Sequence, residues 1–103
     1  MPGPAVEEYL SVLGEASALE AAVAWYRAVG ALARVEVGLI RVPTLYLWGD
    51  ADHSVGASAA RWTADFVTGP FRFEIVSGVG HFITDEAPDL VTAHVLEHIA
   101  AHP

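Results

Sequence analysis

Two short apolar runs in the C-terminal half of the chain are each followed by a loop rich in glycine and polar residues. The first run extends from Thr44 to Trp48, and the second covers residues 71–76. Apolar runs of this length are typical of strands buried on both faces of a parallel sheet. Residues 57–67, between them, have the apolar spacing of a helix. The pattern predicts a strand–helix–strand unit, which is expected to be parallel and right-handed.

Helical periodicity predicts two helices before the strands. The first covers residues 6–13. The second runs from Ser17 to about residue 33, and Ser17 with Glu20 forms a capping-box pattern at its start. The chain is therefore expected to be one segment, with helices over residues 1–33 followed by strand, helix, strand and helix over residues 43–103.

A last helix is expected after the second strand and ends near Ala101. Asp85 or Asp89 can cap its N-terminus, because a side-chain carboxylate accepts hydrogen bonds from the first free amides of a helix. Pro88 fits the first turn, where its missing N–H has no partner to lose.

Acidic side chains follow the first strand, and a histidine follows the second. Asp50 and Asp52 come directly after Gly49, and His81 comes after the 71–76 strand and a short glycine-rich loop. The carboxyl ends of parallel strands meet at one edge of a sheet, where α/β proteins place their working residues. A carboxylate–imidazole pair is therefore expected at this edge. The alternative is that these residues only form turns, because Asp, Gly and His are common in loops.

Composition narrows the range of partners and compartments. The 103-residue chain carries a formal charge of −8, with 13 acidic residues and 5 arginines, and it has no lysine. Such a chain is not expected to bind nucleic acid or anionic membranes. No apolar stretch is long enough to span a bilayer and no signal-peptide pattern opens the sequence, so a cytoplasmic location is expected. The absence of cysteine excludes disulfides and thiolate metal sites.

Four stretches of the sequence carry a family likeness. Three of them resemble the C-terminal third of an α/β-hydrolase: VPTLYLWGDAD at 42–52, GVGHF at 78–82, and DEAP at 85–88 before an amphipathic helix. The fourth, AVAWYRAVG at 22–30, resembles the last part of the lid in the epoxide hydrolase and haloalkane dehalogenase branch. The likeness begins near residue 15. It implies a partial α/β-hydrolase fold, with two parallel strands, flanking helices and a sheet completed by another chain.

The resemblance implies roles for three residues. Asp52 is the expected acid of a catalytic triad, because the family pattern of Gly, two residues and Asp matches Gly49 and Asp52 and disfavours Asp50. His81 is the expected triad histidine, held by Asp52 in the tautomer and orientation of a general base. Tyr26 resembles a lid tyrosine that hydrogen-bonds the epoxide oxygen in epoxide hydrolases. Its alternative role is that of an aromatic side chain packed in a helical core.

The sequence lacks the other half of such an active site. In this family the nucleophile lies on a sharp strand-to-helix turn and the oxyanion hole uses an earlier loop. No Gly-x-Ser-x-Gly elbow occurs in the chain, nor its aspartate counterpart. We therefore predict that the chain alone is inactive and takes a small-molecule substrate only when the N-terminal part of the fold is supplied. The alternative is a non-catalytic remnant that serves as an oligomerising or binding module.

The predicted sheet is too small to be stable in isolation. Two strands alone are marginal in water. The first strand would have one unpaired edge, with exposed side chains at Leu45, Tyr46 and Leu47, and such an edge favours pairing with another chain. A homodimer is expected, or association with a chain that supplies the missing strands.

Two other clusters contain residue types that bind metal ions. His94, His98 and His102 have the spacing of one helix face, which suits a transition metal, but histidine also occurs on solvated helix faces. Asp50, Asp52 and Glu86 lack the ligand number and spacing of a dedicated calcium loop. No metal and no cofactor are therefore expected.

Overall fold

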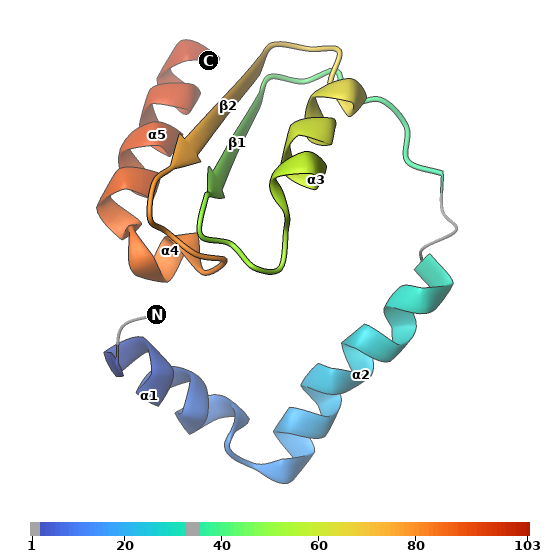
Figure 1. The fold of residues 1–103 in the computed structure, drawn as a ribbon, viewed down its shortest axis with the longest axis vertical. Coiled ribbons are helices and arrows are strands. Elements are labelled where there is room, and N and C mark those ends of the chain that lie inside the picture. Colours follow the sequence, from blue (N-terminus) through green and yellow to red (C-terminus); the bar gives the residue numbers. More distant parts are fainter. Residues whose placement is uncertain (1–2, 33–35) are drawn as a thin grey trace. The chain divides into compact units, whose positions relative to one another are not determined.

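The computed structural model describes residues 3–32 and 36–103, in two compact units, Met1–Val37 and Gly38–Pro103. The first unit contains the helices α1 (Gly3–Leu13) and α2 (Ala16–Leu32), which Figure 1 shows in blue and cyan.

The turn between α1 and α2 corrects the expected helix start. Gly14 donates its N–H to the carbonyl of Leu10, which closes the last turn of α1. The N–H of Leu19 already bonds to the carbonyl of Glu15, so α2 begins at Ala16 and Ser17 lies inside it. The predicted Ser17 cap is therefore wrong, because the tight turn at Gly14 brings the chain into helix earlier than the side-chain pattern indicated. The expected helix end at residue 33 lies outside the described residues.

The second unit alternates strands and helices in the predicted order. Its elements are β1 (Thr44–Gly49), α3 (Ala57–Trp62), the 3-10 helix η1 (Thr63–Phe66), β2 (Phe71–Val76), α4 (Ile83–Glu86) and α5 (Pro88–Ala101). The single helix predicted for residues 57–67 is thus a short α-helix that tightens into 3-10 geometry, a common way for an α-helix to end.

The start of the last helix also differs from the prediction. A separate turn of helix, α4, precedes α5, and Ala87 occupies the N-cap position of α5 without a side-chain hydrogen bond. Asp85 lies within α4 and Asp89 within the first turn of α5, so neither caps α5. Pro88 is the first residue of α5, where the prediction placed it.

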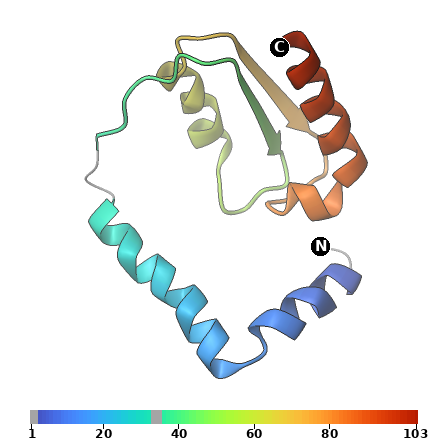
Figure 2. The same cartoon turned by 180° about the vertical axis from the view of Figure 1, so that it is seen from behind.

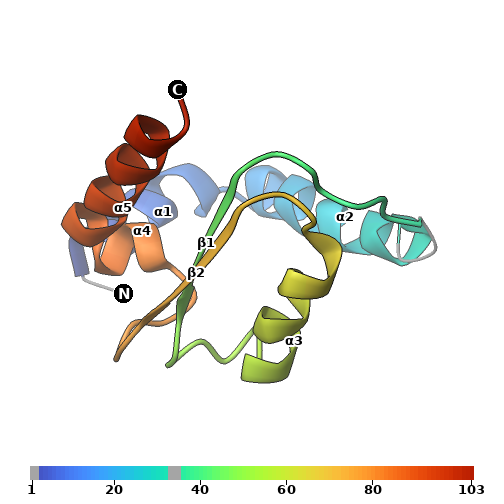
Figure 3. The same cartoon turned by 90° about the horizontal axis from the view of Figure 1, so that it is seen from above.

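The two strands form a parallel sheet in which Thr44 is opposite Phe71 and Gly49 is opposite Val76. The helices α3 and α5 lie on opposite sides of the strand pair (Figures 1 and 3). Seen from behind, the strands run side by side in the same direction (Figure 2). The loops that follow the strands therefore leave the sheet at the same edge, as the sequence pattern predicted.

The hydrophobic core of the second unit is thin. Among the described residues, the buried hydrophobic side chains are Trp48, Ala60 and Val76. The rings of Tyr46 and Phe73 stack across the strands with centroids 5.2 Å apart. Tyr46 and its neighbours Leu45 and Leu47 are half-buried, where the sequence predicted exposure.

Other apolar side chains remain in contact with solvent. On α5, Val95, Leu96 and Ile99 are exposed, although amphipathic helices normally bury such residues.

None of the helices in the described ranges is both long and apolar enough to cross a bilayer.

Trp48 is expected to dominate the stability of the second unit. It is 7% exposed, and its indole N–H donates to the carbonyl of Val55 at 2.9 Å. Trp48→Ala is therefore expected to lower the free energy of unfolding by about 3–5 kcal/mol. Trp62, which is 68% exposed, provides the matched control, and Trp62→Ala is expected to change it by no more than about 0.5 kcal/mol. Urea unfolding followed by circular dichroism measures both; equal losses would contradict this assignment of the core.

Candidate active site

The loops after β1 and β2 are joined through their backbones. The N–H of Asp50 donates to the carbonyl of Val76 at 3.1 Å, and the N–H of Ala51 donates to the carbonyl of Val79 at 3.0 Å. Gly49 makes this approach possible, because a Cβ at that position would lie 2.1 Å from the Val79 carbonyl oxygen. A residue without a side chain at the end of β1 thus lets the second loop lie directly against the first.

Asp52 is held by its own loop and by the loop after β2. Its Oδ1 accepts hydrogen bonds from the N–H groups of Ser54 at 2.7 Å and Val55 at 2.9 Å. Its Oδ2 lies 2.9 Å from Nδ1 of His81. The Asp52 side chain is only 6% exposed. The contact between Asp52 and His81 that the sequence predicted is therefore present.

The hydrogen bonds around Asp52 favour its ionised form. Burial alone would raise the pKa of the Asp52 carboxyl, because it penalises the charged form. The hydrogen bonds from His81, Val55 and Ser54, together with the charge of His81, outweigh burial and hold that pKa below its usual value. Asp52 is therefore a carboxylate at neutral pH.

This geometry determines which nitrogen of neutral His81 carries the proton. An ionised carboxylate only accepts hydrogen bonds, so Nδ1 is the donor to Asp52 and Nε2 keeps its lone pair. The His81 side chain is 48% exposed, and its ring meets Phe82 edge-on at a centroid distance of 5.5 Å. An imidazole oriented in this way is able to take a proton from water at Nε2.

A cavity of about 240 Å³ adjoins the pair. Its lining includes Asp52 and His81 together with Tyr46 and Trp48 from β1. Burial, and to a smaller extent the negative charge of Asp52, raise the pKa of the Tyr46 hydroxyl. Sequence reasoning missed Tyr46 as a site residue. The available signal was its strand alternation with Trp48, which places the two residues on one face of β1.

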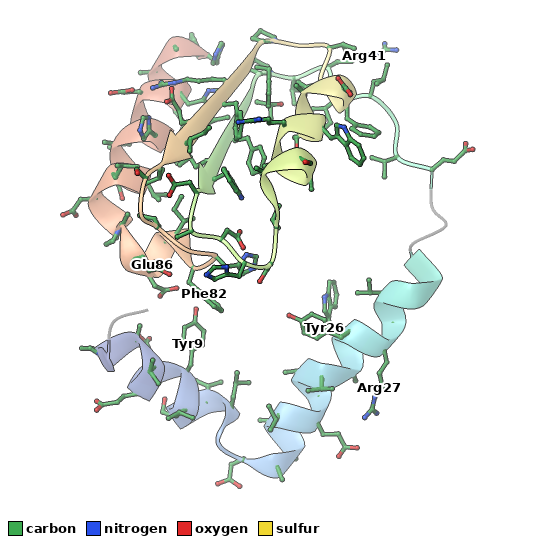
Figure 4. The ribbon with its side chains drawn as sticks, in the orientation of Figure 1. Tyr9, Tyr26, Arg27, Arg41, Phe82 and Glu86 are labelled. Carbon is green, nitrogen blue, oxygen red and sulfur yellow. The ribbon has the colours of Figure 1, made fainter. Side chains whose placement is uncertain are left out.

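Two carboxylates near the pair have roles that the sequence did not reveal. Asp50, the alternative acid, directs Oδ1 to the N–H of Gly78 at 2.6 Å rather than to His81. Glu86, on α4, accepts the N–H of Gly80 through Oε2 at 2.9 Å. Figure 4 labels Glu86 on α4 beside Phe82 of the preceding loop.

Tyr26 is in the other unit. It lies on α2, where its side chain is 75% exposed and projects to a different side from that of Arg27 (Figure 4). The role expected for Tyr26 at the catalytic site stays a prediction from the family resemblance.

The histidines of α5 have separate environments. Nδ1 of His94 lies 3.1 Å from Nη2 of Arg72. Because a guanidinium group only donates hydrogen bonds, His94 Nδ1 is the acceptor. Arg72 also donates to Glu74 and Glu97. His102 follows the end of α5, and its ring lies 4.7 Å from that of His98. Within residues 3–32 and 36–103, no group of three or more histidines and acids is arranged to hold a metal ion.

The lowered pKa of Asp52 makes a prediction for acid stability. A carboxyl with a lower pKa in the folded chain stabilises the fold above its unfolded pKa, about 3.9 for Asp, and this contribution disappears as pH falls through the folded-state pKa. As the pH falls from about 5 to about 2, the free energy of unfolding is therefore expected to decrease less for Asp52→Asn than for the wild type. Glu74, whose pKa is lowered by its hydrogen bond to Arg72, supplies part of the dependence that remains.

Urea unfolding at a series of pH values measures this difference. The matched control is Asp65→Asn, which removes an exposed carboxylate of η1 outside the site and is expected to follow the wild-type curve. An unchanged acid dependence in Asp52→Asn would contradict the role given to the Asp52 hydrogen bonds.

Comparisons with known proteins agree with the fold. No protein-family model matches the sequence. The chain is 29% identical over 86 residues to "Epoxide hydrolase 4" of Homo sapiens, which covers 84% of this chain and 24% of that protein. It is 35% identical over 60 residues to "Epoxide hydrolase A" of Mycobacterium tuberculosis (strain ATCC 25618 / H37Rv). That match covers 58% of this chain and 19% of that protein. The chain thus spans about a quarter of the length of the curated relatives it matches.

A solved structure shares the fold. ClbQ from the colibactin NRPS/PKS pathway matches with a TM-score of 0.57 and 24% sequence identity, over 66% of this chain and 28% of ClbQ. At this identity the match concerns the fold alone. The chain therefore corresponds to a C-terminal part of the α/β-hydrolase fold, and its sequence relatives are epoxide hydrolases.

Proposed function

We propose that the chain supplies the acid–base half of an epoxide-hydrolase-like active site, with Asp52 as the orienting acid and His81 as the general base. The observation that carries the proposal is the 2.9 Å contact between His81 Nδ1 and Asp52 Oδ2 beside a cavity. The sequence relatives named as epoxide hydrolases support the reaction class.

The proposed chemistry follows from the free Nε2 of His81. In the reaction that the resemblance implies, a carboxylate on the absent part of the fold bonds to an epoxide carbon and breaks its C–O bond. The epoxide oxygen becomes an alkoxide that takes a proton from solvent water, which leaves a hydroxy ester. His81 then removes a proton from a water molecule through Nε2 while the water oxygen bonds to the ester carbonyl carbon. The resulting tetrahedral intermediate breaks its bond to the alkyl oxygen, which takes the proton from the His81 imidazolium, so that a diol leaves and the carboxylate is restored. The negative charge of Asp52 stabilises the imidazolium between these steps.

Tyr26 and the helices of residues 1–33 have a proposed role on the lid side. In this proposal the Tyr26 hydroxyl donates a hydrogen bond to the epoxide oxygen and stabilises the alkoxide that develops there. The substrate class is a small epoxide, which rests on Tyr26 and on the names of the relatives. The proposed steps use no metal and no organic cofactor.

The chain alone is proposed to be inactive. An acid and a base do not replace the nucleophile, and each oxyanion-hole donor typically contributes about 10²–10³-fold to the rate. The relatives are about four times longer than the matched segment, so their remaining sequence is the natural source of these groups.

The edge of β1 is the proposed attachment point for the missing part. Within the described residues, β1 pairs with β2 on one side and has no strand on the other. An unpaired strand edge offers free N–H and C=O groups to another strand. We propose that β1 pairs with a strand of the N-terminal part of the fold, or with a second copy of this chain. A cytoplasmic location is part of the same proposal.

A chimera tests the catalytic proposal. Epoxide hydrolase A, with its matched segment replaced by the corresponding segment of this chain, is expected to hydrolyse an epoxide such as styrene oxide. His81→Ala in the chimera is expected to lower kcat by about 10²–10⁴-fold, because it removes the general base. His98→Ala is the matched control, since it changes a histidine on α5 away from the cavity. Turnover by the isolated chain, or equal activity of the His81→Ala chimera, would contradict the proposal.

The second candidate is a non-catalytic module, favoured by the exposed apolar residues of α5. Light scattering tests the self-association that this second candidate requires. The chain is expected to form dimers at micromolar concentration, and Leu96→Glu to shift the equilibrium toward monomer if α5 takes part in the contact. A stable wild-type monomer would remove the module.

A further inference from the structure

The loop that carries His81 is held at three consecutive residues by groups from outside the loop. Asp50 Oδ1 accepts the N–H of Gly78 at 2.6 Å. The carbonyl of Val79 accepts the N–H of Ala51 at 3.0 Å. Glu86 Oε2 accepts the N–H of Gly80 at 2.9 Å. These bonds come from the end of β1 on one side and from α4 on the other.

We propose that Asp50 and Glu86 are positioning residues that hold His81 against Asp52. The inference rests on the proposed function, in which His81 is the general base. Neither carboxylate has to touch the substrate, because each acts through the backbone that precedes His81.

The peptide unit between residues 79 and 80 is fixed at both ends. Its carbonyl oxygen belongs to Val79 and bonds to Ala51, while its N–H belongs to Gly80 and bonds to Glu86. Since a peptide unit is planar, two bonds on opposite sides of it set its orientation. Between this plane and the His81 side chain, the backbone keeps only the φ and ψ angles of Gly80 and the φ angle of His81.

Glycine at residues 78 and 80 favours these bonds. A Cβ on Gly80 would lie 3.0 Å from Oε1 of Glu86. The absence of a side chain at residue 80 therefore leaves room for the Glu86 carboxylate beside the N–H of Gly80. Gly78 has φ +73°, a left-handed conformation that side chains disfavour, and this conformation accompanies its bond to Asp50.

Asp50 also couples the two partners of the catalytic pair. It lies two residues before Asp52 on the loop after β1, and its carboxylate reaches across to the loop that carries His81. One short segment therefore supplies the carboxylate that contacts His81 and a hydrogen-bond acceptor that fixes the position of the His81 loop. Loss of the Asp50 carboxylate is expected to loosen the loop while Asp52 keeps its bonds to Ser54 and Val55.

The tautomer of His81 indicates whether its Nδ1 lies against Asp52. We would label the histidines of the full chain with ¹⁵N and measure the ratio of Nδ1–H to Nε2–H for His81 at about pH 8.5, where free imidazole is neutral. The wild type is expected to be mainly Nδ1–H. In Asp50→Ala and in Glu86→Ala this ratio is expected to fall about fivefold, the equilibrium value of one ordinary hydrogen bond.

Conservative variants separate positioning from charge and from general loosening of the fold. Asp50→Asn and Glu86→Gln keep an acceptor oxygen and are expected to stay within about twofold of the wild-type ratio. Asp65→Ala, in η1, is the carboxylate control and is expected to leave the ratio unchanged. The signals of His94, which binds Arg72, are expected to stay constant in every variant, because a positioning role concerns His81 alone.

The outcomes distinguish this inference from the proposed function. A wild-type His81 that is mainly Nε2–H would overturn the Asp52–His81 pair itself. A wild type with Nδ1–H and an unchanged ratio in both alanine variants would leave the pair intact and overturn the positioning role. Equal losses in the Asn and Gln variants would also overturn it, as would loss of the His94 signals together with those of His81. Because Asp50 and Glu86 lie on different elements, failure of one alanine variant to fold leaves the other comparison decisive.

Discussion

The site depends on the direct approach of two backbones at the carboxyl edge of the sheet. Gly49 has no side chain, so the segment at Val79 and Gly80 lies where a Cβ would otherwise be. That contact brings the loop after β2 within hydrogen-bonding distance of the loop after β1. This close approach, which the missing side chain at residue 49 allows, brings His81 into contact with Asp52.

The chain combines a well-organised polar site with a poorly covered apolar surface. Asp52 has a hydrogen-bond partner for each oxygen, yet the buried hydrophobic side chains in the described residues are few and α5 exposes Leu96 and Ile99. Burial of apolar surface is the main source of folding free energy. The chain spans about a quarter of the length of the curated relatives it matches, so it has correspondingly fewer residues with which to cover apolar surface.

The sequence predicted the strands and the main contact because both follow from short-range patterns. Apolar runs defined β1 and β2, and the family spacing distinguished Asp52 from Asp50. Helix ends were predicted less well, since the start of α2 depends on the turn at Gly14 and not on the capping preference of Ser17. The contacts of Asp50 and Glu86 were not predictable, because they involve backbone amides whose direction is set only when the loops fold together.

The bonding of Asp52 has a consequence for how such sites evolve and are engineered. One oxygen of the carboxylate is satisfied by amides only two and three residues ahead, so its orientation is encoded locally. The polar half of the site is therefore a self-contained cassette spanning residues 49 to 86. Recombination between related genes would be able to transfer that cassette as a unit, because Gly49 and both loops of the site lie within it.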